Sequence, residues 1–140
     1  MAKWKFRSID RSTDYFGPAV YKVRLLTGAE VVKLPRFLGH DRSGILQIGV
    51  SGSFEKRRRQ FVRGLAIGRG HSEGNLLHIL QHRSRLLETF HECSYEIAFV
   101  EMAERDEALV EEETLIKRYF TRFGEVPPLN TQLPNRYVWD

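Results

Sequence analysis

The sequence predicts an α+β fold: a small, mostly antiparallel sheet of three or slightly more strands, flanked by three helices. Segments that favour strands come first, two helical segments follow, and one more strand precedes a last helix. Strands and helices therefore mix without regular βαβ alternation, which is typical of α+β domains. With 140 residues, 41% hydrophobic and 29% charged, the chain has the size and composition of one globular domain.

The two ends of the chain differ in composition from its middle. Residues 1–16 are mostly polar or charged and are expected to form a loose N-terminal arm. Residues 17–130 hold the periodic apolar segments and are expected to form the folded domain. Residues 131–140 follow the Pro-Pro pair at 127–128, contain Pro134 and Asn135, and are expected to form a C-terminal tail.

The strands are predicted from alternation and from turn residues. Residues 20–26 alternate and are rich in branched side chains, which predicts a strand that ends at a Thr-Gly turn. Residues 31–34 predict a second strand, whose length Pro35 limits. The apolar residues 45–49 and, later in the chain, residues 95–100 predict two buried strands.

Three segments predict helices. Residues 54–67 follow Ser53, which is a candidate N-cap. Residues 73–88 carry leucines at near-helical spacing. Residues 104–123 form the clearest amphipathic segment, and Gly124 predicts where that helix stops.

The composition limits the compartment and the classes of partner. The single cysteine, Cys93, excludes an internal disulfide and indicates a reducing compartment. The start of the chain lacks the apolar core of a signal peptide, and no apolar run approaches bilayer length. The sequence therefore predicts a cytoplasmic protein that does not enter a membrane.

Basic residues gather in one part of the chain. Lys and Arg number 22 against 18 acidic residues, and several of them lie between residues 56 and 69. Such a cluster favours a polyanionic partner. A solvated helix face explains the same charges, so both interpretations stay open at this point.

The basic block of the first predicted helix divides between two faces. Phe54 and Phe61 mark its core side, and helical spacing places Arg57 and Arg58 on that same side. An arginine in such a position pairs with an acid or serves a site. The outward stripe consists of Lys56, Arg59 and Arg63.

An acidic residue falls in the apolar stripe of the last predicted helix. Glu112 lies four residues after Ala108 and four before Ile116, both of which mark the buried face. A carboxylate in an apolar stripe is costly unless it is paired or bound to metal. Glu112 is therefore either the partner of a core-side arginine or a metal ligand. His71, after a glycine-rich break, could face the same region or merely be exposed.

Several of these segments resemble, in order, the motifs of the GIY-YIG nuclease superfamily. That superfamily includes phage homing endonucleases, some restriction enzymes and the incision domain of the bacterial excision-repair nuclease. The resemblance spans residues 17–130. The matching segments are AVY at 19–21, QIG at 47–49, SFEKRRRQF at 53–61, GHSEGN at 70–75, ALVEEETLIK at 108–117 and PPLN at 127–130.

The resemblance implies a divalent-metal-dependent DNA endonuclease. Glu112 would hold Mg²⁺ or Mn²⁺, and Arg57 would stabilise charge on the scissile phosphate. Tyr21 would position or deprotonate the attacking water, His71 matches the histidine of the homing enzymes, and Asn130 would support the site by hydrogen bonding. Phosphate contacts outside the reacting centre are expected from Lys56, Arg58, Arg59 and Arg63.

One departure from the family leaves the activity open. Gln47 stands where the second motif tyrosine is expected, and a glutamine can orient water but cannot take its proton at neutral pH. An active nuclease would therefore use Tyr21 or His71 as the base. The alternatives are a DNA-binding domain that has lost cleavage and a structural or protein-binding module. The small size of the domain makes a homodimer or an additional DNA-binding partner plausible.

Overall fold

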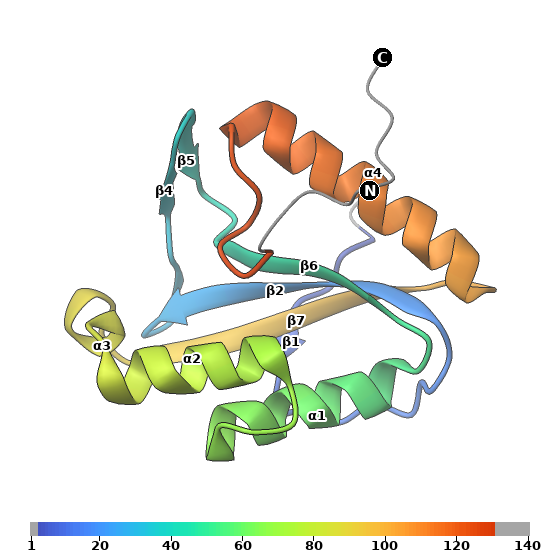
Figure 1. Cartoon of the computed structure of the whole chain (residues 1–140), viewed down its shortest axis with the longest axis horizontal. Coiled ribbons are helices and arrows are strands. Elements are labelled where there is room, and N and C mark those ends of the chain that lie inside the picture. Colours follow the sequence, from blue (N-terminus) through green and yellow to red (C-terminus); the bar gives the residue numbers. More distant parts are fainter. Residues whose placement is uncertain (1–2, 131–140) are drawn as a thin grey trace.

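The computed structural model describes residues 3–130. It is a β-sheet with helices on both of its faces (Figure 1). The α+β class, the antiparallel pairing and the three longer helices are confirmed. The main sheet has five strands, where the sequence predicted three or slightly more. The helices are α1 (Phe54–Ile67), α2 (Ser72–Arg83), the one-turn α3 (Leu86–Thr89) and α4 (Arg105–Phe123).

The main sheet is built around the long strand β2 (Ala19–Thr27). On one side β2 pairs with β7 (Cys93–Glu101), and on the other side it pairs with β6 (Ile45–Ser51) and, beyond it, with β3 (Glu30–Val31). A fifth strand, β1 (Arg7–Ser8), pairs with the far edge of β7. All of these pairs are antiparallel, and this order leaves β6 at an edge of the sheet.

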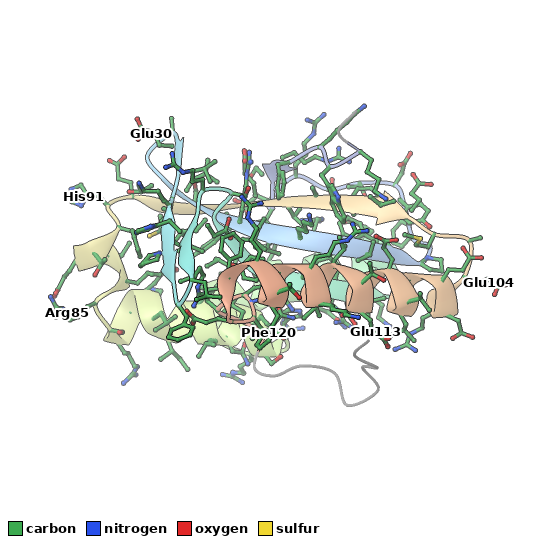
Figure 2. All side chains as sticks on the ribbon, turned by 90° about the horizontal axis from the view of Figure 1, so that it is seen from above. Glu30, Arg85, His91, Glu104, Glu113 and Phe120 are labelled. Atoms are coloured by element: carbon green, nitrogen blue, oxygen red, sulfur yellow. The ribbon has the colours of Figure 1, made fainter. Side chains whose placement is uncertain are left out.

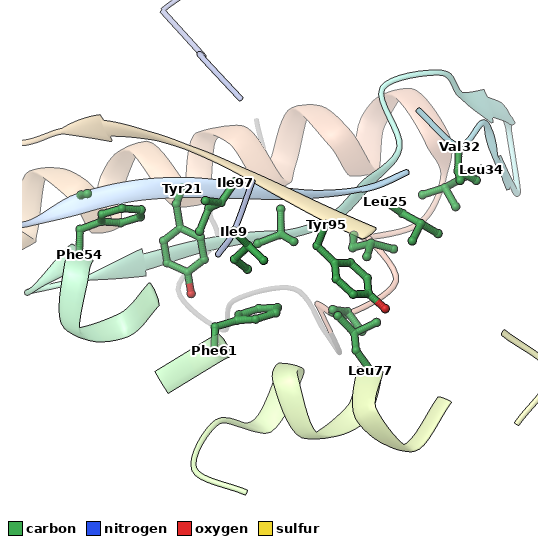
Figure 3. Close-up of a cluster of buried hydrophobic side chains, with 14 residues drawn as sticks. Ile9, Tyr21, Leu25, Val32, Leu34, Phe54, Phe61, Leu77, Tyr95 and Ile97 are labelled. Atoms are coloured by element: carbon green, nitrogen blue, oxygen red, sulfur yellow. The ribbon is translucent and has the colours of Figure 1, made fainter. Parts of the chain in front are cut away.

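Alternation along β2 divides the core between the two faces of the sheet. Tyr21, Val23 and Leu25 enter the cluster beneath α1 and α2, together with Phe54 and Phe61 (Figure 3). Their neighbour Val20 enters a second cluster beneath α4, which also holds Ile48, Ile116, Tyr119 and Phe123. This period of two is the one that the sequence showed in residues 20–26.

The N-terminal segment is part of the fold and is not a loose arm. Two of its residues form β1, and Ile9 is only 2% exposed within the core beneath α1 and α2. The backbone carbonyls of Tyr15 and Gly17 also accept hydrogen bonds from the first backbone N–H groups of α1. The prediction of a loose arm over residues 1–16 was therefore wrong for its described part, because a two-residue strand leaves no periodicity in the sequence.

The strand predicted over residues 31–34 is not continuous, because β3 (Glu30–Val31) ends at Val31 and a separate hairpin begins at Leu34. Strands β4 (Leu34–Arg36) and β5 (Gly39–Asp41) pair only with each other, with Pro35 opposite His40. Proline is tolerated there because each strand of an isolated ribbon is an edge. The hairpin contacts the end of α4, where the backbone N–H of Leu38 donates to the carbonyl of Phe123.

The second predicted helix is shorter than expected. The segment predicted over residues 73–88 breaks after Arg83, because Ser84 takes an extended conformation, and a single turn, α3, follows. The other two helices begin and end within about one residue of their predicted bounds. The predicted tail at residues 131–140 lies outside the described residues. Within residues 3–130, no helix is both long enough and apolar enough to span a bilayer.

Candidate active site

Tyr21 is the centre of the candidate site. It is 1% exposed, and its ring extends from β2 toward α1 between Phe54 and Phe61 (Figure 3). Gly49 lies opposite Tyr21 in the β2–β6 register, and a Cβ built on Gly49 would come within 2.4 Å of the tyrosine Cζ. The glycine of the QIG motif therefore makes room for the tyrosine ring to lie across β6.

Three charged residues from three different helices act on the Tyr21 hydroxyl. Burial raises the pKa of Tyr21 to about 12, and Glu73 and Glu112 add to the rise through their charges. Arg57 opposes them, both through its charge and as a hydrogen-bond partner of the phenol. The structure thus brings together Tyr21, Arg57 and Glu112, which the sequence predicted as parts of one site. The high pKa keeps Tyr21 protonated at neutral pH.

His71 joins the same group of residues from the start of α2. It is 7% exposed, and its ring lies 4.6 Å from the ring of Phe61, measured between centroids. Its Nδ1 accepts a 3.0 Å hydrogen bond from the backbone N–H of Gly74, so His71 is the N-cap of α2. Burial lowers the pKa of His71; Glu73 opposes this effect and Arg57 adds to it. The neutral ring therefore carries its proton on Nε2 and is built to donate there.

A close crossing of two helices fixes the position of His71. A Cβ built on Gly74 of α2 would come within 2.6 Å of the Phe61 carbonyl oxygen, and one on Gly64 of α1 would come within 3.0 Å of the Gly74 Cα. Only glycines allow the backbones to approach so closely. The crossing holds the first turn of α2 against the helix that carries Arg57.

Gln47 and Asn130 belong to the β6 side of the site. Gln47 pairs with Val23 across the β2–β6 ladder, so it shares the sheet face of Tyr21. It is 6% exposed, and within residues 3–130 its Oε1 has no hydrogen-bond partner. Asn130 holds the neighbouring Ile48: its Oδ1 accepts from the backbone N–H and its Nδ2 donates to the carbonyl, both at 2.9 Å. Asn130 therefore fixes the strand that carries Gln47.

Arg58 has a structural role, which contradicts its predicted place among the nucleic-acid contacts. It is 5% exposed, and its Nε and Nη2 both donate at 2.7 Å to the carboxylate of Glu55. Its Nη1 donates to the backbone carbonyl of Ile9. Glu55, which is 0% exposed, also accepts from the backbone N–H of Thr13. This pair ties the N-terminal segment to α1 and leaves no surface of Arg58 for a ligand.

The other three basic residues of α1 face outward as expected. Lys56, Arg59 and Arg63 are exposed. Arg59 also donates to Glu55 at 2.9 Å and lies 5.4 Å from the ring of Phe16. Arg57 is half-buried between this exposed surface and the Tyr21 hydroxyl. A nucleic-acid backbone that followed the exposed surface of α1 would therefore pass Arg57.

Glu73 is the member of the site that the sequence interpretation missed. Its charge affects both Tyr21 and His71, its Oε2 lies 3.6 Å from the His71 Nδ1, and it accepts a 2.6 Å hydrogen bond from the Ser72 hydroxyl. It lies two residues after His71 in the first turn of α2, where an acid is expected beside the helix dipole. Because the helix dipole already explains an acid at this position, the sequence alone did not indicate that Glu73 also acts on Tyr21.

The side chains around Tyr21 include oxygen donors of the kind that a divalent cation binds. Within residues 3–130, no cluster of three or more His, Cys, Asp or Glu residues could form an all-protein metal cage. Mg²⁺ is commonly held by one or two carboxylates, with water and substrate phosphates completing its shell. Glu112, whose charge acts on Tyr21, supplies a donor of that class. The residues therefore fit a cation that binds together with phosphate.

Comparison with known proteins adds no relative. No family model, curated protein or solved structure matches the chain. Membership of the GIY-YIG superfamily therefore stays a prediction from the motifs of the sequence.

Proposed function

We propose that this chain is a GIY-YIG-type endonuclease that hydrolyses phosphodiester bonds in DNA with the help of Mg²⁺ or Mn²⁺. One observation carries the proposal. Tyr21, Arg57, His71 and Glu112 come from four separate segments; the charges of Arg57 and Glu112 act on the Tyr21 phenol, and that of Arg57 also acts on His71. Charged groups gathered around one buried side chain with a shifted pKa are a feature that clusters at functional sites.

Each group around Tyr21 has a role that suits phosphodiester hydrolysis. A divalent cation held by Glu112 would neutralise charge on the phosphate oxygens. Arg57 reaches the same region with a fork of donors that fits phosphate, and it stabilises the charge that grows as water attacks phosphorus. Burial raises the pKa of the Tyr21 phenol, so its role in this proposal is to orient the water through its hydroxyl.

The carboxylate of Glu73 is the proton acceptor that fits this geometry. Gln47 cannot take a proton, Tyr21 has a pKa of about 12, and the His71 Nδ1 is occupied by the backbone of Gly74. Water attack forms a P–O bond and breaks the bond to the leaving oxygen. The proton of the water passes to Glu73, and the leaving oxygen is protonated from solvent.

The exposed face of α1 supplies the DNA contacts in this proposal. Lys56, Arg59 and Arg63 lie on the same helix as Arg57 and bind the phosphates that flank the scissile one, without reading bases. Base selection then needs a second copy of the chain or another DNA-binding partner. The composition is consistent with action in the cytoplasm.

A plasmid cleavage assay tests the proposal. Supercoiled DNA should be nicked or linearised in Mg²⁺ or Mn²⁺ and left intact when EDTA is added. Glu112→Ala should lower the rate roughly 100-fold or more, because the cation loses its protein ligand. The matched control is Glu107→Ala, which removes an exposed carboxylate from the same helix. Equal cutting with and without metal would rule out this mechanism.

A second candidate is a DNA-binding domain that does not cleave. Gln47 favours it, because this buried amide stands at the position of the family's second tyrosine. DNA binding that weakens with salt, without cleavage in any metal, supports this candidate. Cleavage that appears only in Gln47→Tyr would assign the loss to that position. If the chain neither binds nor cuts DNA, a structural or protein-binding module is the remaining interpretation.

A further inference from the structure

A separate pocket lies on the other face of the sheet, beneath α4. Figure 2 shows α4 lying over the sheet on that face. Its volume is about 560 Å³, within the range of roughly 300–1,000 Å³ that is usual for small-ligand sites. Lys22 of β2 and Ile48 of β6 line it from the sheet, and Arg118 and Arg122 line it from α4. It involves neither Tyr21 nor Arg57, and among the α4 glutamates Glu111 lines it but Glu112 does not.

The pocket is rich in positive charge. Five cationic side chains line it against two carboxylates. One of these carboxylates, that of Asp41, already accepts hydrogen bonds from the backbone N–H groups of Ser43 and Ile45 and from the Tyr119 hydroxyl. Burial lowers the pKa of Lys22, so gaining an anionic partner would offset its desolvation. The charges therefore favour an anionic ligand.

Aromatic rings form part of the same wall and are held in place. The ammonium of Lys22 lies 4.4 Å from the centroid of the Trp4 ring, and the guanidinium of Arg24 lies 4.0 Å from that of Phe6. Both aromatic residues line the pocket. Rings ordered by cation–π contacts lose little freedom when a planar ligand packs against them.

We propose that this pocket binds a nucleotide, with its base packed against the aromatic wall and its phosphate beside Arg118 and Arg122. Aromatic rings next to cations are the combination that binds unpaired nucleotides, since every base offers a planar face and every phosphate a negative charge. The nucleotide is either free or an unpaired nucleotide of a single strand. The proposal does not depend on the nuclease site, because it uses none of that site's residues.

Fluorescence titration tests this pocket with Trp4 as the reporter. The sequence holds two tryptophans, so a Trp139→Phe background leaves Trp4 as the sole source of the signal. Glu112→Ala in the same background, with EDTA present, removes the proposed cleavage from the experiment. The probes are thymidine monophosphate, a short oligothymidylate, thymidine and inorganic phosphate.

Saturable quenching by the monophosphate or the oligothymidylate, at lower concentrations than thymidine or phosphate alone require, is the expected result. A monophosphate that binds as tightly as the oligothymidylate identifies a free nucleotide, and tighter binding of the oligothymidylate identifies a single strand. Arg118→Ala with Arg122→Ala should weaken binding about tenfold or more. Arg83→Ala, which removes an exposed cation from α2, should leave it unchanged.

The shift of the Trp4 indole N–H resonance in NMR spectra provides a second readout that does not depend on quenching. Circular dichroism of each variant confirms that the fold is intact. The absence of saturable binding by both readouts would overturn the proposal. Binding that survives the α4 double variant but is lost in Lys56→Ala would also overturn it, because the ligand would then lie on α1.

Discussion

The Tyr21 ring lies across Gly49, with its Cζ only 2.4 Å from where a Cβ of residue 49 would stand. The two residues face each other on β2 and β6, and each comes from a different one of the short motifs that suggested a nuclease. The glycine is needed for space, because Tyr21 is packed in the core with only 1% of its surface exposed. This contact therefore affects both the packing of the sheet and the position of Tyr21 in the candidate site.

Gly49→Ala should therefore affect both stability and the site. The added methyl group overlaps the phenol ring, and overpacking of this kind costs about 1–3 kcal/mol. Urea denaturation measures that loss, and loss of cleavage in the folded variant reports the displaced hydroxyl. Gly52→Ala is the matched control: its added Cβ would come no closer than 3.5 Å to Arg105. If Gly49→Ala retains wild-type stability and activity, the contact does not constrain the site.

Arg57 and Arg58 are neighbours with opposite expected phenotypes. Arg58→Met leaves the Glu55 carboxylate with its main partner removed and should destabilise the fold by about 3–5 kcal/mol. Arg57→Met should change the free energy of unfolding by much less and should abolish phosphodiester cleavage. Chemical denaturation and the plasmid assay on both variants give the comparison. A reversed pair of phenotypes would contradict both assignments.

The Glu55–Arg58 pair predicts a loss of stability in acid. Hydrogen bonds from Arg58 are the main reason that the pKa of Glu55 falls from 4.5 to about 2 in the folded chain. Because the folded pKa is the lower one, Glu55 stabilises the fold above pH 4.5. That contribution is lost as the pH falls from 4.5 toward 2.

Urea denaturation of the wild type and of Glu55→Gln across this pH range isolates the contribution of Glu55. The difference in unfolding free energy between the two proteins should shrink in acid, since other carboxylates titrate in both. Parallel pH profiles would mean that Glu55 does not carry this dependence.

Glu73→Gln tests the proton acceptor. The amide keeps the size of the side chain and the start of α2 but removes the basic oxygen. The cleavage rate should fall about 100-fold or more, with DNA binding unchanged. Glu88→Gln, at an exposed position in α3, should have no effect. An unchanged rate in Glu73→Gln would exclude Glu73 as the acceptor.

Long periodic segments were predicted from sequence better than short or paired ones. Residues 20–26 and 104–123 carry clear periods, and β2 and α4 match them closely. Strand β1 has two residues and no period, so only its pairing with β7 defines it. The β4–β5 ribbon contains a proline that argued against extending a strand there, yet an isolated ribbon tolerates it.

The same limit applies to the site. The motifs identified Tyr21, Arg57 and Glu112, whose charges or hydrogen bonds meet, while their chemical roles remain predictions. Helical spacing alone could not separate Arg57 from Arg58, because both fell on the core side. The ion-pair partner distinguishes the two arginines. Glu55 lies three residues before Arg58, a spacing at which side chains on a helix can pair, so this spacing could have identified the structural pair from the sequence.

The bonds that Leu129 and Asn130 make to β6 have a consequence for self-association. Leu129 donates to the carbonyl of Leu46, and Asn130 satisfies both backbone groups of Ile48. An edge strand with free backbone groups is a template for another chain, and these two residues cover the part of β6 from Leu46 to Ile48. A homodimer would therefore form through side-chain surfaces rather than by extending the sheet at β6, and deleting residues from 129 onward would expose an edge prone to aggregation.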